Sequence, residues 1–179
     1  MRRLLVWSVL GGAACASGSP VPETGASSQR TIQVPGVAGK LTVVSSTRAN
    51  VSKLAYTADE VWKVLPAALD SLGVKSRVID ATERVIGVEN FKLRVQLGRT
   101  PLSRYLDCGQ TQIGPNADSY EVLLTVLAQV HAAETGSSLS MTVAAAAKPI
   151  AFRQDYMRCS TKGLLESRLL DAVKKQLQH

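Results

Sequence analysis

The feature that most constrains the fold is a pair of long stretches with alternating character in the second half of the chain. They cover residues 120–131 and 138–148, and Glu134-Thr135-Gly136 lies between them. A period of two is typical of half-buried strands, and a short connection with a glycine joins antiparallel neighbours. We therefore predict a long β-hairpin. The alanine run at 144–147 stays in this register, so we expect it to be strand, with small side chains beneath a helix.

A helix is expected to begin after Thr57. The segment Thr57-Ala58-Asp59-Glu60 has the spacing of a capping box, in which each end residue's side chain accepts from the other's backbone N–H. Gly73 is placed to end this helix in a left-handed conformation. One apolar stripe runs along the helix and consists of Val61, Leu65, Ala68, Leu69 and Leu72.

A second helix is expected near the C-terminus. Ser160 or Thr161 can cap its start. Lys174 and Lys175 fall in its final turns, where the helix dipole favours positive charge. Its apolar residues recur every four positions, at Leu165, Leu169, Val173 and Leu177.

Shorter strands are expected between the first helix and the hairpin. Residues 74–80 and 84–89 surround a polar turn and predict a small hairpin. Residues 91–97 alternate cleanly but out of phase with the preceding strand, and a bulge or turn at Glu89-Asn90 restores the phase. Residues 98–118 are rich in Gly, Pro, Asn and Asp, so we expect a long irregular connection with a helical turn at 102–106.

Three upstream strands, at 31–34, 41–44 and 51–56, complete the expected order. Strands that precede and follow a helix in this way imply an α+β fold. We predict an antiparallel β-sheet with two helices packed on one face.

The N-terminus has the anatomy of a bacterial export signal. Met1-Arg2-Arg3 gives a positive start, an apolar stretch follows, and small residues lead into Cys15. The segment Gly12-Ala13-Ala14-Cys15 resembles the lipobox of bacterial lipoproteins, in which the cysteine is acylated and becomes the first residue. We expect 1–14 to be a lipoprotein signal peptide and Cys15 to be the lipid attachment site. The alternative is soluble secretion, because Ala14-Cys15-Ala16 also fits a small-x-small cleavage site.

The segment after the cysteine predicts a tether followed by one domain. Residues 15–29 hold mostly Gly, Ser, Pro and Ala with one charge, Glu23, and are expected to form a flexible linker. The 179-residue length leaves room for a single domain, at 30–179, and 45% hydrophobic residues exclude a mostly disordered chain. The resemblance to lipoproteins implies that the domain is anchored in the cell envelope. In that family, a residue other than aspartate beside the acylated cysteine, here Ala16, implies sorting to the outer membrane, and we expect the domain on its periplasmic side. The alternative location is soluble periplasmic or secreted.

The chain has three cysteines, an odd number that calls for an explanation in an exported protein. Acylation of Cys15 removes the odd cysteine, and we expect Cys108 and Cys159 to form a disulfide in an oxidising compartment. The alternatives are a thiol enzyme, in which Cys108 acts with His131 and Asp107, and a metal site. No CxxC or HxxxH spacing is present, so we expect no metal.

The net charge points to an anionic neighbour. The formal charge of +7 falls by two when Arg2 and Arg3 leave with the leader, and a basic domain suits anionic lipid or an acidic polymer. We expect no nucleic-acid partner, because an exported protein leaves the compartment that holds nucleic acid. In addition, no aromatic side chains on which bases could stack accompany the basic residues. The ordinary alternative for these residues is a solvated strand face. The expected basic patch consists of Lys92, Arg94, Arg99 and Arg104.

The motifs of common enzyme classes are missing from the sequence. It contains no GxGxxG, GxxxxGK[ST], GxSxG or HExxH. We therefore expect a non-enzymatic protein without a cofactor.

One segment resembles a known envelope module. Residues 56–97 place Ala68-Leu69-Asp70-Ser71-Leu72-Gly73 before a strand, an acidic turn and a second strand. This pattern is similar to the helix-grip module of the C lipoprotein family of the outer-membrane β-barrel assembly machinery. The chain carries one such module, and the Cys108/Cys159 pair is not part of that pattern. The resemblance implies a helix-grip-like two-layer sandwich in an anchored, non-enzymatic envelope protein, with other envelope proteins or anionic lipid as partners.

Two functions follow as expectations. The first is a periplasm-facing accessory or scaffold domain. The alternative is a carrier of a small apolar ligand or lipid, because a bent sheet that grips a helix can enclose an apolar cavity.

Overall fold

The computed structural model describes residues 51–178. Its centre is the predicted hairpin, formed by β9 (Glu121–Ala132) and β10 (Ser137–Lys148). Every residue of one strand pairs with a residue of the other, from Ala132 opposite Ser137 to Glu121 opposite Lys148. The alanine run lies within β10, as expected.

The strand β3 (Val85–Arg94) pairs with β9 along the edge that faces away from β10. The register shifts between Val88 and Phe91, which confirms the predicted bulge. Asn90 adopts a φ of 51° there and donates its backbone N–H to the Thr125 hydroxyl at 3.1 Å. The edge strand β2 (Val78–Asp80) is shorter than expected, because residues 74–77 are not strand.

Two strands pair with the other edge of β10, one near each of its ends. One is β1 (Ser52–Leu54), which is shorter than the predicted strand at 51–56, and the other is β11 (Met157–Thr161). The short β6 (Leu106–Asp107) pairs with β11 and completes the order β2-β3-β9-β10-β11-β6. The expectation that Ser160 or Thr161 caps the last helix is wrong, because both residues belong to β11.

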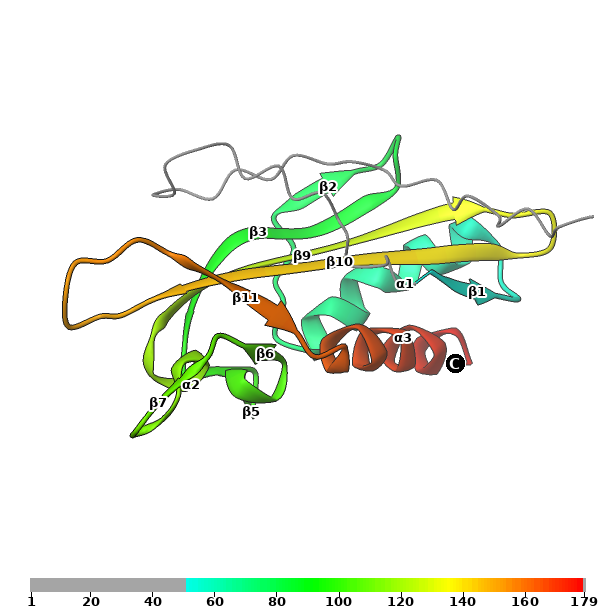
Figure 1. Ribbon diagram of the computed structural model, residues 1–179. Helices are drawn as coiled ribbons and strands as arrows, with labels where there is room; N and C mark the ends of the chain where they lie inside the picture. Colours follow the sequence, from blue (N-terminus) through cyan, green and yellow to red (C-terminus); the bar gives the residue numbers. More distant parts are fainter. Residues whose placement is uncertain (1–50, 179) are drawn as a thin grey trace, which may run out of the picture.

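Both long helices cover one face of this sheet (Figure 1). They are α1 (Ala58–Ser71) and α3 (Leu164–Leu177), and they contact each other as well as the sheet. Their apolar stripes are fully buried at Leu65, Leu69 and Leu169. The protein is therefore an α+β two-layer arrangement, with an antiparallel sheet and helices on one face, as the sequence predicts.

The ends of α1 follow the predicted capping chemistry. The capping box is complete, since the Glu60 side chain accepts from the Thr57 backbone N–H at 2.8 Å and the Thr57 hydroxyl accepts from the Glu60 N–H. Gly73 has a φ of 81° and donates to the Asp70 carbonyl, while Val74 donates to the Leu69 carbonyl. These two bonds form a Schellman motif, so the helix ends where expected.

The connection between β3 and β9 is folded into short pieces, as the sequence suggests. The predicted helical turn is present as η1 (Leu102–Arg104), and a four-residue helix, α2 (Asn116–Ser119), precedes β9. Two tiny hairpins complete it: β4 (Gln96–Leu97) with β5 (Thr100–Pro101), and β7 (Gln110–Thr111) with β8 (Gly114–Pro115).

Several sequence predictions lie outside the described residues. They are the signal peptide at 1–14, the attachment site Cys15, the linker at 15–29, and the strands at 31–34 and 41–44. Among residues 51–178, none of the helices has the length and apolar character needed to cross a bilayer.

Candidate functional site

The predicted disulfide is present. Cys108 and Cys159 are bonded, and both are buried. The pairing of β6 with β11 places the two residues opposite each other, one step beyond the Asp107–Ser160 pair. The bond therefore fastens the irregular connection before β9 to the strand that leads into α3.

The most concentrated polar cluster surrounds Glu121, the first residue of β9. Arg94 of β3 and Lys148 of β10 are its direct partners in the two flanking ladders. Their neighbours along the strands, Leu93, Val122 and Ala147, face the core. Because side chains alternate along a strand, Glu121, Arg94 and Lys148 lie on the sheet face opposite the helices.

Three cations contact this one carboxylate. Lys92 Nζ and Lys148 Nζ lie 3.3 Å and 3.5 Å from Glu121 Oε1, and Arg94 lies 3.7 Å from Oε2. The Glu121 side chain is only 10% exposed, whereas those of Lys92 and Arg94 are more than half exposed. We call Lys92, Arg94 and Lys148 the basic cluster.

Tyr156 completes the environment of Glu121. It follows β10 after a loop and donates its hydroxyl to Glu121 Oε1 at 2.6 Å, and Lys148 Nζ lies 4.7 Å from the centre of its ring. This hydrogen bond is the main reason that the pKa of Glu121 falls to about 2, with Lys92 and Lys148 adding to the effect against the burial that opposes it. Burial, and then the same hydrogen bond, raise the pKa of Tyr156 to about 12.

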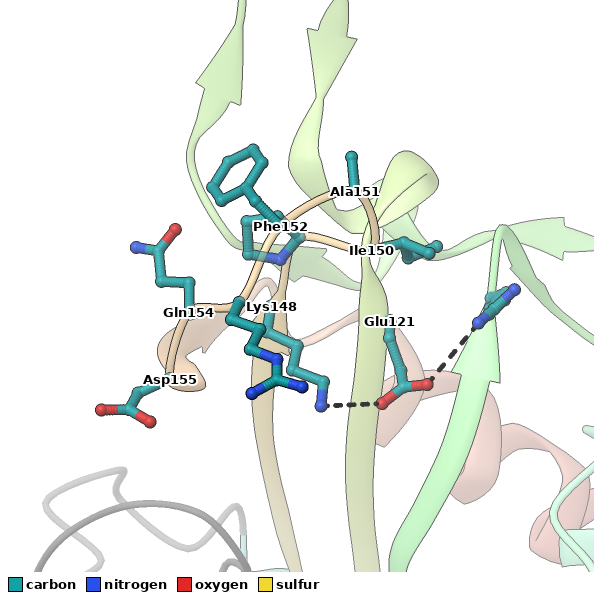
Figure 2. Close-up of a pocket in the computed structure, with 10 residues that line it drawn as sticks. Glu121, Lys148, Ile150, Ala151, Phe152, Gln154 and Asp155 are labelled. Carbon is teal, nitrogen blue, oxygen red and sulfur yellow. Dashed lines mark ion pairs between the residues drawn. The ribbon is translucent and has the colours of Figure 1, made fainter.

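Above this cluster, the loop at 149–156 borders an open pocket of about 570 Å³. Figure 2 shows Ile150, Ala151 and Phe152 at the outer bend of the loop, while Glu121 and Lys148 lie at its base. The side chains of Ile150 and Phe152 are 50% and 62% exposed. The residues that line the pocket are Arg94, Glu121, Lys148, Pro149, Ile150, Ala151, Phe152, Arg153, Gln154 and Asp155.

The charges of this site favour an anion over acid–base chemistry. Three cations face one carboxylate, which leaves an excess of two positive charges in the basic cluster. At neutral pH the pKa values keep Glu121 ionised and Tyr156 protonated, so neither exchanges a proton readily. The arrangement can therefore hold a negatively charged group at the exposed cations.

The structure divides the basic patch predicted from the sequence. Lys92 and Arg94 contact Glu121, whereas Arg99 lies in the turn between β4 and β5 and Arg104 ends η1. Arg99 and Arg104 are exposed, and neither is among the cations within 4 Å of Glu121.

Sequence reasoning missed three members of the site: Glu121, Lys148 and Tyr156. A signal for two of them was present, because a hairpin centred on residues 134–135 places position 121 opposite position 148. Opposite charges at such positions are a favourable cross-strand pair. The contribution of Tyr156 depends on the path of the loop, for which the sequence gives no comparable signal.

The alternative thiol enzyme lacks its nucleophile in this structure. Cys108 is held in the disulfide. His131 is also distant, since it lies seven residues along β9 from Leu124, the level at which Cys159 joins the sheet. At about 3.3 Å per residue the separation along the strand is about 23 Å. Within residues 51–178, no group of three or more His, Cys, Asp or Glu residues is placed to hold a metal.

The pocket at the loop differs from the cavity that an apolar carrier requires. It is open, half of its ten lining residues are charged, and it lies at the end of the sheet and not between the helices and the sheet. Between those layers, Val61, Leu65 and Leu69 of α1 have no exposed surface.

Comparison with known proteins identifies no relative of this chain. No family model, no curated protein and no solved structure matches this chain.

Proposed function

We propose that this chain is a lipid-anchored, non-enzymatic envelope protein whose α+β domain serves as a periplasm-facing accessory or scaffold. The observation that carries the proposal is the Cys108–Cys159 disulfide. A buried structural disulfide is typical of an exported protein. It also leaves Cys15 as the odd cysteine, in the position where the leader pattern places the lipid.

The polar site supports a binding role over a catalytic one. Its carboxylate is ionised, its tyrosine is protonated, and its remaining charge is an excess of cations suited to an anionic partner. The resemblance of residues 56–97 to the C lipoprotein module agrees with an envelope role. We place the anchor in the outer membrane because Ala16 follows the acylated position.

The anchor is tested by growing cells that express the full chain with a labelled fatty acid. We expect label on the unmodified chain and on the matched control Ser17→Ala, and none on Cys15→Ser. Label on Cys15→Ser, or an unlabelled wild-type chain, would contradict the proposal.

The orientation is tested with a membrane-impermeant, lysine-reactive reagent. Lysines of the domain such as Lys174, which is exposed on α3, are expected to react only after the outer membrane is permeabilised. Equal reaction on intact cells would place the domain on the outer surface.

A further inference from the structure

The loop at 149–156 combines exposed apolar side chains with cations at its base. It carries exposed apolar side chains at its bend, and Lys148 of the basic cluster lies at its base beside Glu121 (Figure 2). In Figure 1 the loop between β10 and β11 projects beyond the sheet, at the end opposite the β9–β10 turn. The loop is therefore free to meet a flat partner without interference from the helices.

The apolar bend indicates a partner with an apolar interior. Ile150 and Phe152 are exposed by half or more, although neighbouring Pro149 is buried and fixes the base of the loop. Two bulky side chains held in water at the tip of a projecting loop gain free energy when they enter a hydrocarbon phase.

The basic cluster indicates that the same partner is anionic. Lys92, Arg94 and Lys148 outnumber Glu121 by two charges, and Arg153 and Asp155 of the loop offset each other in formal charge. Cations at the base of an apolar tip match the order of layers in a bilayer, where charged headgroups lie outside the acyl chains. Tyr156 lies at the base of the loop, where its hydroxyl donates to Glu121 and Lys148 approaches its ring.

We propose that the loop at 149–156 and the basic cluster dock this domain on the surface of an anionic lipid bilayer. Ile150 and Phe152 enter the boundary of the acyl chains, and the basic cluster binds the phosphate-bearing headgroups. Glu121 on β9 holds together the cations of the two flanking strands, β3 and β10, so the binding surface is formed before contact. The inference goes beyond anchoring through Cys15 and does not require it.

The test uses a probe at the loop itself, so that lipid attachment elsewhere in the chain cannot produce the signal. Phe152→Trp is introduced into the full chain, and its fluorescence is measured after subtraction of the spectrum of the unmodified chain. Vesicles contain phosphatidylcholine with brominated acyl chains, either alone or mixed with phosphatidylglycerol. We expect quenching and a blue shift only with phosphatidylglycerol, and we expect high salt to remove both.

Charge variants test the role of the basic cluster. Each basic residue near an anionic surface contributes about fivefold to partitioning. Lys92→Gln with Lys148→Gln therefore weakens insertion roughly thirtyfold, with folding checked by circular dichroism. The matched control, Lys174→Gln with Lys175→Gln in the exposed last turn of α3, leaves the quenching unchanged.

A second probe tests the place of contact. Ile79 is 66% exposed on the edge strand β2, away from the loop, and Ile79→Trp is expected to show no quenching. Quenching at position 79 equal to that at position 152, or equal quenching by vesicles of phosphatidylcholine alone, would overturn the proposal. Absence of quenching with both vesicles would also overturn it and would point to an acidic protein as the occupant. None of these three outcomes bears on anchoring, because fatty-acid labelling of Cys15 reports on anchoring alone.

Discussion

Removal of one hydroxyl tests the account of Glu121 most sharply. Tyr156→Phe keeps the ring that Lys148 approaches and deletes the 2.6 Å hydrogen bond to the carboxylate. That bond is the largest cause of the low pKa of Glu121. The variant should therefore raise the pKa of Glu121 and destabilise the folded state wherever Glu121 is ionised.

The size of the effect follows from the pKa. A fall from 4.5 to about 2 corresponds, at about 1.4 kcal/mol per unit, to at most about 3.5 kcal/mol from all the groups around Glu121. Solvent in the open pocket screens part of this, and a hydrogen bond to a charged group contributes about 1.5–3 kcal/mol. We expect Tyr156→Phe to lose about 1.5 kcal/mol near neutral pH.

The pH dependence has a definite sign. Because the folded pKa of Glu121 is depressed, its stabilisation is present above about pH 4.5 and is lost as the pH falls towards 2. The difference between wild type and Tyr156→Phe should therefore shrink to less than about 0.5 kcal/mol near pH 2. Urea unfolding at both pH values measures it.

Tyr120→Phe is the control for this prediction, because Tyr120 is a half-buried tyrosine that packs against the core and lies beside Glu121 in sequence. We expect no such pH-dependent difference for it. An equal loss for Tyr156→Phe at both pH values, or no loss near neutral pH, would show that the hydroxyl of Tyr156 does not stabilise ionised Glu121.

Three further substitutions test the fold. Cys108→Ser with Cys159→Ser removes the crosslink between residues separated by 51 positions. The loop-entropy model predicts a loss of about 4 kcal/mol in the free energy of unfolding. Denaturant unfolding measures this loss, and a value below about 1 kcal/mol would contradict the prediction. Gly87→Ala places a Cβ against the Val126 carbonyl of the adjacent strand. The free energy of unfolding should therefore fall by more than about 2 kcal/mol, and a melting temperature equal to that of the wild type would contradict this prediction. Thr57→Ala removes the cap of α1 and should cost about 1 kcal/mol, whereas Thr57→Ser should restore most of this stability in the same unfolding assay.

The sequence predicted the elements whose signals are local. The capping box at Thr57 and the left-handed Gly73 defined α1, and the out-of-phase alternation at Glu89-Asn90 located the bulge. The disulfide between Cys108 and Cys159 was predicted from the odd number of cysteines and from the export signal, which implies an oxidising compartment. Each of these predictions depends on a few neighbouring residues or on simple counting, so tertiary context did not alter it.

The candidate site was mostly not predictable, because it depends on pairing between distant segments. Glu121 stands in the sequence between Tyr120 and an apolar run. The hairpin register indicates its pairing with Lys148, but its burial among three cations arises only when β3 is also in register with β9. The start of α3 was misplaced for a related reason. Thr161 pairs with Leu106 of β6. Ser160 and Thr161 therefore belong to β11 and not to the start of the helix, and α3 begins at Leu164.

Mass spectrometry of the protein purified from its own envelope reads out the fate of all three cysteines at once. We expect a mature N-terminus at Cys15 that carries lipid, and a single peptide pair linked through Cys108 and Cys159 with no free thiol. A chain that still carries residues 1–14, or free thiols at both Cys108 and Cys159, would show that the cysteines do not have these roles.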